Sequence, residues 1–302
     1  MDTAARAQDE LTKVTLRRAG FAIPLVVSIV AGWHPLTDTF GLALSDDNYT
    51  YILLIAPISA AMIVLDWRLI RRIAAPGLIA GSALLAAAVL IALSALVWSA
   101  SLAPDVQLSM KMFALVLSWC GAFLLCFGYR AARFVLFPIC FAFALVPFPQ
   151  VVMNEIIVLL QQGSAWSANL LFAIFGVPVA QNGVFLAIPG LTLKVAQECS
   201  SIRSSSMLLV TTVVLAQLLL RSPWRKALLI GVAIPLSVAK NGLRIFSIAM
   251  LGTRVDRVYI TGRFHHDGGI IFFAIALIVI FAFLWLLKKG DRVSGRFDIN
   301  TL

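Results

Sequence analysis

Long apolar runs separated by short charged clusters form the main pattern of this sequence. A transmembrane helix needs about 20 predominantly apolar residues, and eight segments approach that length. They cover residues 20–37, 51–67, 77–100, 109–128, 134–152, 202–220, 226–250 and 269–287. The pattern predicts an all-α integral membrane protein of about eight transmembrane helices, organised as a single polytopic membrane domain over residues 1–302.

Basic residues gather at alternate ends of these runs, and they predict the orientation of the chain. Lys and Arg in short loops stay on the cytoplasmic side of a membrane. The clusters lie at residues 17–18, 68–72, 130–133, 221–226 and 288–292. With eight spans, every cluster falls inside, whereas Asp47, Asp105 and Glu155 fall outside. We therefore expect a multi-pass protein of the bacterial cytoplasmic (inner) membrane, with residues 1–19 and 288–302 cytoplasmic and residues 20–287 in the membrane domain.

The segment from residue 154 to residue 196 begins and ends on the outer face in this topology, although much of it is apolar. Polar side chains are interspersed among the apolar ones in residues 154–175, which favours a helix lying at the membrane interface. A ninth span is the alternative, and it would invert the topology of everything that follows. Two β-prone runs, 184–188 and 191–195, flank Pro189 and Gly190 and predict a short β-hairpin before the sixth span.

The composition excludes several classes of protein. Hydrophobic residues make up 61% of the chain and charged residues 13%, so water is not its main solvent. The net charge of +10 comes from the topology-setting clusters, and we expect no nucleic-acid partner. No cysteine or histidine spacing is typical of a metal site, so we expect neither a metal nor a cofactor. The first apolar run lacks a small-residue cleavage site after it and is expected to remain as an uncleaved anchor.

Cys199 differs from the other cysteines of the chain in its surroundings. Cys120, Cys126 and Cys140 lie within apolar runs, where a thiol behaves as a small hydrophobic group. Cys199 instead follows Glu198 and precedes a run of polar residues at the start of the sixth span. This position predicts a reactive thiol at the membrane surface.

The seventh span contains three polar residues, Lys240, Asn241 and Arg244. A cation near the centre of a span costs about 2.5–3.5 kcal/mol on insertion scales, so such residues usually face a protein interior or a watery cavity. Lys240 and Arg244 are one turn apart on one helix face. The alternative is that either side chain extends to the surface as an anchor.

A basic loop with paired histidines, His265 and His266, precedes the last span. In the predicted topology Cys199, Arg244 and His265 lie at one depth on the outer (periplasmic) face. A neighbouring base or cation favours the thiolate. His265 could carry the proton and Arg244 could stabilise the thiolate or an oxyanion. This arrangement predicts a cysteine acyl-transfer site, without naming its substrate.

These residues resemble the exosortase/archaeosortase family of membrane transpeptidase-like enzymes. The likeness is carried by three blocks, Glu198-Cys199-Ser200-Ser201-Ile202-Arg203-Ser204, Asn241-Gly242-Leu243-Arg244-Ile245 and His265-His266-Asp267-Gly268-Gly269, and by the early segment 46–51. The resemblance implies Cys199 as nucleophile, Arg244 as stabilising cation and His265 as proton-transfer residue, with His266 as the alternative histidine. Glu198, Arg203, Lys240 and Asn241 are expected to support the site or bind substrate.

The resemblance also implies the substrates and leaves the second half of the reaction open. They would be exported proteins that end in a Pro-Glu-Pro-like (PEP-CTERM-like) motif, a transmembrane helix and a basic tail. Cleavage would pass through a thioester acyl-enzyme that water or an acceptor resolves.

Two readings from other classes remain beside this one. A transporter or lipid-binding protein would use Lys240 and Arg244 for an anionic ligand. A structural partner within an exopolysaccharide-assembly machinery would not depend on Cys199, Arg244 or His265. In every reading membrane lipids surround the chain.

Overall fold

The computed structural model describes residues 26–194, 202–256 and 269–289 of the chain. Helices dominate these residues, and seven of the helices described are long and apolar enough to cross a membrane. By its packing the chain divides into an N-terminal unit, residues 1–153, and a C-terminal unit, residues 154–302. The expectation of one polytopic domain over residues 1–302 stays a prediction.

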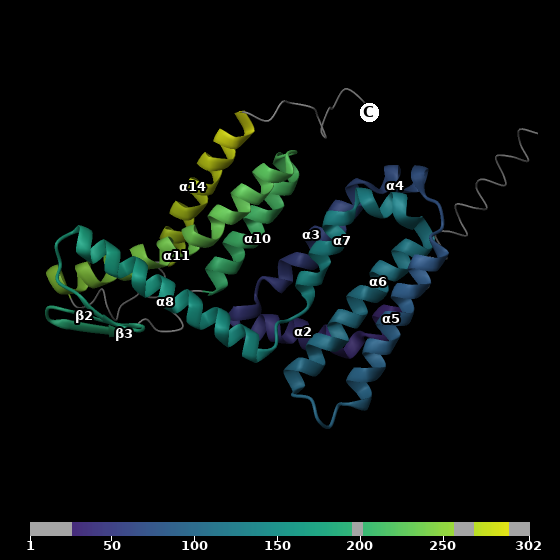
Figure 1. The fold of residues 1–302 in the computed structure, drawn as a ribbon, viewed down its shortest axis with the longest axis horizontal. Helices are drawn as coiled ribbons and strands as arrows, with labels where there is room; N and C mark the ends of the chain where they lie inside the picture. Colours follow the sequence, from purple (N-terminus) through teal and green to yellow (C-terminus); the bar gives the residue numbers. More distant parts are fainter. Residues whose placement is uncertain (1–25, 195–201, 257–268, 290–302) are drawn as a thin grey trace, which may run out of the picture. The chain divides into compact units, whose positions relative to one another are not determined.

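The N-terminal unit is a helical assembly in which α5 and α6 form the most extensive pair (Figure 1). Its elements in chain order are α2 (Trp33–Ser45), the 3₁₀ helix η1 (Asp47–Tyr49), α3 (Ile52–Leu65), α4 (Trp67–Ile73), α5 (Leu78–Val97), α6 (Pro104–Phe134), α7 (Leu136–Ala142) and the 3₁₀ helix η2 (Phe143–Leu145). The predicted span 51–67 overlaps the candidate span Asp47–Leu65, the predicted span 77–100 contains Leu78–Val97, and the predicted span 109–128 lies within Pro104–Phe134. The predicted first span begins outside the described residues, and its helical conformation continues to Ser45.

Helix α6 has a kink near its C-terminal end, where the α4–α5 connection binds to it. Gly128 has φ of 74°, and a Cβ at this position would lie 2.9 Å from the carbonyl carbon of Ala75, so only glycine fits. The kink interrupts the helical ladder, and backbone N–H groups outside α6 donate to its carbonyls. Gly77 donates to Leu124 at 3.2 Å, and Ala75 donates to Phe127 at 3.1 Å. The α4–α5 connection therefore satisfies backbone groups within the apolar core.

The prediction of one regular span over residues 134–152 is wrong. The segment consists of α7, η2 and an extended stretch that leads to a new helix at Gln150. The prolines at 147 and 149 have no backbone N–H to donate within an α-helix, and a hydropathy profile does not detect this. The segment nevertheless returns along α6: the Ser109 hydroxyl donates to the Pro147 carbonyl at 2.7 Å, and the Gln150 N–H donates to Asp105 Oδ2 at 2.6 Å.

The C-terminal unit combines a three-helix bundle with a small sheet. Its elements are most of α8 (Gln150–Ile174), then β1 (Ala180–Asn182), β2 (Phe185–Ile188), β3 (Leu191–Lys194), α10 (Ile202–Leu219), α11 (Pro223–Arg254) and α14 (Gly269–Lys289). Figure 1 shows α10, α11 and α14 side by side, and all three pack on one another. The last three contain the predicted spans 202–220, 226–250 and 269–287 to within one residue.

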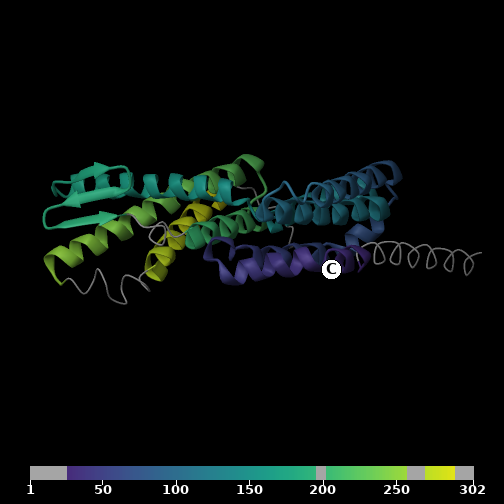
Figure 2. The same ribbon diagram turned by 90° about the horizontal axis from the view of Figure 1, so that it is seen from below.

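The predicted hairpin is confirmed. Strands β2 and β3 pair antiparallel around Pro189 and Gly190, with Ile188 opposite Leu191. A further strand, β1, pairs antiparallel with β2 and was not predicted, because its three residues, Ala-Gln-Asn, have no apolar alternation. Figure 2 shows the sheet beside α8, and a shared apolar cluster joins the sheet to α8 and α11 through Phe172, Leu186 and Ile245.

Helix α8 contains most of the segment that was expected to lie at the interface, residues 154–175. It begins four residues earlier and has one charged residue, Glu155, within a length and hydropathy sufficient to cross a membrane. Its interfacial position stays a prediction. Two of the polar side chains behind that prediction lie on the side of α8 that packs against protein: Ser164 is fully buried, and Ser167 lies against α11.

Candidate active site

The polar residues of α11 form one buried group in the C-terminal unit. The exposed fractions are 6% for Lys240, 1% for Asn241 and 8% for Arg244. Lys240 and Arg244 are one helical turn apart, as their spacing predicted. Burial of both cations within the protein agrees with the expectation that they face an interior. It argues against the alternative in which each side chain extends to the membrane surface.

Lys240 is held by the neighbouring helix. Its ammonium donates a hydrogen bond to Oγ of Ser204, which lies in the first turn of α10. The short connection between α10 and α11 makes these two helices antiparallel neighbours. The Lys240–Ser204 bond therefore fixes their register at the end of the pair where α10 begins.

Arg244 lies against the beginning of the last helix. A Cβ on Gly269, the first residue of α14, would lie 3.8 Å from Nη1 and 3.9 Å from Cζ of Arg244. The guanidinium and the first N–H groups of α14 both present positive charge here. An anion between them would be stabilised by both.

Helices α8 and α11 cross closely next to the buried polar residues of α11. A Cβ on Gly242 would lie 2.5 Å from Cβ of Ser167 and 2.9 Å from the backbone nitrogen of Ala168. The two backbones therefore touch at Gly242, between Asn241 and Arg244 in the chain. The glycine of the predicted block thus has a packing reason as well as a place beside the site.

The other predicted residues divide into two groups. Arg203 is described, and it is exposed in the first turn of α10. Four predicted residues lie outside the described residues: Glu198, Cys199, His265 and His266. Of the expected catalytic residues, the structure therefore places Arg244 alone.

Sequence reasoning did not assign a role to Ser204 or to Gly269. The sequence did contain a signal for Ser204. Its hydroxyl lies in the first turn of α10, and in an antiparallel helix pair this position can lie beside Lys240 of α11. The signal for Gly269 was its position as the first residue of the last helix. Within residues 26–194, 202–256 and 269–289, no three His, Cys, Asp or Glu side chains are grouped as a metal site.

Comparison with known proteins gives one match. The family model of the transmembrane exosortases (EpsH type) matches residues 43–282, which include α3 to α11 and most of α14. No curated protein matches the chain. No solved structure matches it either.

Proposed function

This chain belongs to the transmembrane exosortase family, and on that premise we propose that it is a cysteine-dependent enzyme that cleaves the C-terminal sorting signal of exported proteins. Membership in the family supports a peptidase or transpeptidase role in the membrane. The finer proposal assigns Cys199 as nucleophile, His265 as proton-transfer residue and Arg244 as stabilising cation. It is supported by the buried position of Arg244 beside the start of α14.

Chain length limits how far the two undescribed catalytic residues can be from this position. Cys199 precedes the first residue of α10 by three residues, and His265 precedes Gly269 by four. A chain spans at most about 3.5 Å per residue, so these separations are at most about 10 Å and 14 Å. The Arg244 guanidinium lies beside Gly269, and Lys240, one turn before it, donates to Ser204 of α10. All three residues can therefore reach one site without any rearrangement of the described helices.

The proposed reaction begins with proton transfer. The thiol proton of Cys199 passes to the imidazole of His265, and the thiolate Sγ attacks the scissile carbonyl carbon. The C–S bond forms and the carbonyl oxygen becomes an oxyanion, which the Arg244 guanidinium stabilises by hydrogen bonding and charge. The tetrahedral intermediate collapses as the C–N bond breaks, and the imidazolium gives its proton to the leaving amine.

A thioester on Cys199 remains after the amine departs. Attack by water or by an acceptor nucleophile releases the product and restores the thiol. Lys240 would act indirectly, by holding α11 against α10 through its bond to Ser204. Asn241 is proposed to support the site. Glu198, Arg203 and His266 remain proposed supporting or substrate-binding residues.

The proposed substrate ends in a Pro-Glu-Pro-like motif, a transmembrane helix and a basic tail. A substrate helix in the bilayer would hold the scissile peptide at a constant depth, which converts recognition into proximity. The same proposal places the active site on the outer face of the bacterial inner membrane and both termini in the cytoplasm. Reporter fusions at residues 1 and 302, assayed for cytoplasmic fluorescence, test that orientation.

The central experiment is cleavage of a reporter that carries such a C-terminal signal in membranes containing the full chain. Cys199→Ala is expected to abolish cleavage with unchanged protein level, and mass spectrometry should find a substrate fragment on Cys199 in the wild type. Cys140→Ala is the matched control, because Cys140 is an exposed cysteine of α7, and it should cleave normally. Full cleavage by Cys199→Ala would exclude the thioester mechanism and favour an anion-binding role of Lys240 and Arg244.

The choice between the paired histidines has its own test in the same assay. His265→Gln should lower cleavage as strongly as Cys199→Ala does, whereas His266→Gln should retain most of it. The reverse result would assign proton transfer to His266.

A further inference from the structure

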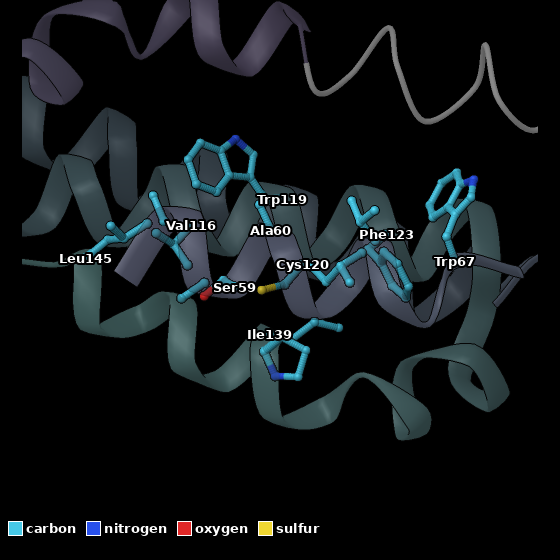
Figure 3. Close-up of a pocket in the computed structure, with 14 residues that line it drawn as sticks. Ser59, Ala60, Trp67, Val116, Trp119, Cys120, Phe123, Ile139 and Leu145 are labelled. Atoms are coloured by element: carbon cyan, nitrogen blue, oxygen red, sulfur yellow. The ribbon is translucent and has the colours of Figure 1, made fainter. Parts of the chain in front are cut away.

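An apolar slot lies within the N-terminal unit, among α3, α6 and α7. Its volume is about 510 Å³. Figure 3 shows its elongated lining, with Leu145 at one end, Trp67 at the other and the Cys120 sulfur and Ser59 hydroxyl between them. The remaining wall is formed by small and apolar side chains such as Ala60 and Phe123. This slot belongs to no part of the proposed active site.

The volume decides which kind of apolar group the slot can hold. A volume of about 510 Å³ lies within the roughly 300–1,000 Å³ typical of pockets that hold a single small ligand. A substrate span of about 20 residues is far larger than this. A narrower chain, such as the acyl chain of a lipid, matches an elongated slot in a membrane protein.

The Trp67 end of the slot has more arginines than carboxylates: five arginines lie on α4 and the C-terminal part of α6, and Asp66 precedes Trp67. Arg71 lies one turn beyond Trp67 on α4, and its Nε is buried and has no hydrogen-bond partner among the described residues. The C-terminal part of α6 packs on α4 through Ile70 and adds further arginines. The exposed arginines at this end are Arg68, Arg72, Arg130 and Arg133. A guanidinium fork matches phosphate oxygens in geometry and charge.

We propose that this slot binds an anionic phospholipid, with one acyl chain between α3, α6 and α7 and the phosphate on Arg71. Charge complementarity selects this occupant over a helix with a basic tail, which the arginines would repel. Trp67 lies between the apolar slot, which would hold the acyl chain, and the arginines, which would hold the phosphate. A tryptophan suits this position, because indole favours the level of the lipid headgroups. The lipid would fill a gap in the N-terminal unit and stabilise the packing of α7 on α3.

The test uses the full-length protein in detergent and native mass spectrometry, with two probes of identical acyl chains: phosphatidylglycerol, which has a phosphate, and diacylglycerol, which has none. The wild type should retain phosphatidylglycerol about tenfold more strongly, as one charge-assisted bond to phosphate implies. Arg71→Gln should reduce this preference to less than about threefold. Ala60→Leu, which fills the slot, should lower retention of both lipids.

Matched controls separate the site from general effects. Lys288→Gln removes a cation from the basic end of α14, and Ala86→Leu enlarges an exposed alanine of α5; both should behave as the wild type. Unchanged thermal midpoints for all variants establish that folding is retained. A variant that fails this check is replaced by Ala56→Val, a smaller filling change in the same slot.

Several outcomes would overturn the proposal. Equal retention of the two lipids by the wild type would exclude binding of the phosphate to Arg71. Unchanged retention by a variant whose slot is filled would exclude binding of the acyl chain in the slot. Ser59 Oγ is buried without a partner among the described residues, so a polar occupant would pair with it, whereas an acyl chain would not. Loss of retention in Ser59→Ala, or displacement of lipid by a basic-tailed transmembrane peptide, would therefore assign the slot to another occupant.

Discussion

The bond between Lys240 and Ser204 gives the sharpest test of how α10 and α11 present the active site. Lys240→Met removes the ammonium and keeps most of the apolar stem, and Ser204→Ala removes the acceptor of the bond. The side chain of Lys240 is 6% exposed, so the bond lies away from water. Each change should reduce cleavage because the start of α10, three residues after Cys199, loses its attachment to α11.

The expected magnitude follows from the kind of bond and its surroundings. Hydrogen bonds to charged groups contribute about 1.5–3 kcal/mol, while side-chain pairs within membrane proteins average about 0.6 kcal/mol and reach about 1.7. We expect a coupling free energy of about 1.5 kcal/mol. Ser204→Ala should destabilise more than Lys240→Met, because it leaves the buried charge in place and removes its acceptor. If the same free energy of about 1.5 kcal/mol is lost from the transition state of cleavage, the rate falls about tenfold.

A double-mutant cycle measures that coupling. The free energy of unfolding in detergent is determined for the wild type, the two single variants and the double variant. The control cycle uses Lys226 and Gln217, which pair at 2.7 Å at the other end of the same two helices, where both side chains are half-buried. That pair should couple by no more than about 0.5 kcal/mol, as partly solvated charged pairs do.

Additive effects in the Lys240–Ser204 cycle, within about 0.5 kcal/mol, would refute the reasoning. So would a coupling no larger than that of the control pair. If the coupling is present but cleavage stays at the wild-type rate in both single variants, the bond stabilises the bundle without positioning the site.

Three further predictions concern single positions. Gly242→Ala should destabilise the protein by about 1–3 kcal/mol, because its Cβ would enter Ser167 and Ala168 of α8; Gly231→Ala on the same helix, where a Cβ meets nothing within 4 Å, should be neutral or stabilising in the same unfolding assay. Gly128→Ala should lower the yield of folded protein in size-exclusion chromatography, and a normal yield would contradict the assigned kink. Arg244→Gln should reduce cleavage about 100-fold or more with unchanged protein level, and a cleavage rate within about threefold of wild type would exclude it as the oxyanion donor.

Much of the fold was accessible from the hydropathy pattern. Apolar runs of sufficient length predicted the helices at 77–100 and 269–287 to within three residues at each end, because a span must satisfy its backbone internally and therefore forms a helix. The Pro189-Gly190 turn predicted the hairpin, since local turn chemistry determines it. The pattern was wrong at 134–152, where hydropathy is high but prolines break the helix, and it gave no signal for the short polar strand β1.

For the site, the order and spacing of residues along the chain identified the reactive groups: a thiol, two histidines and the cations of the seventh span, in blocks that resemble one family. The surroundings of those cations depend on how the helices pack. Lys240 could have met any polar group, and the antiparallel register of α10 and α11 made its partner Ser204. Arg244 could have reached the membrane surface, and the packing of α14 placed its guanidinium against Gly269. Hydropathy and residue spacing describe one segment of the chain at a time. The partner of a buried charge depends instead on which helices pack against each other in the bundle.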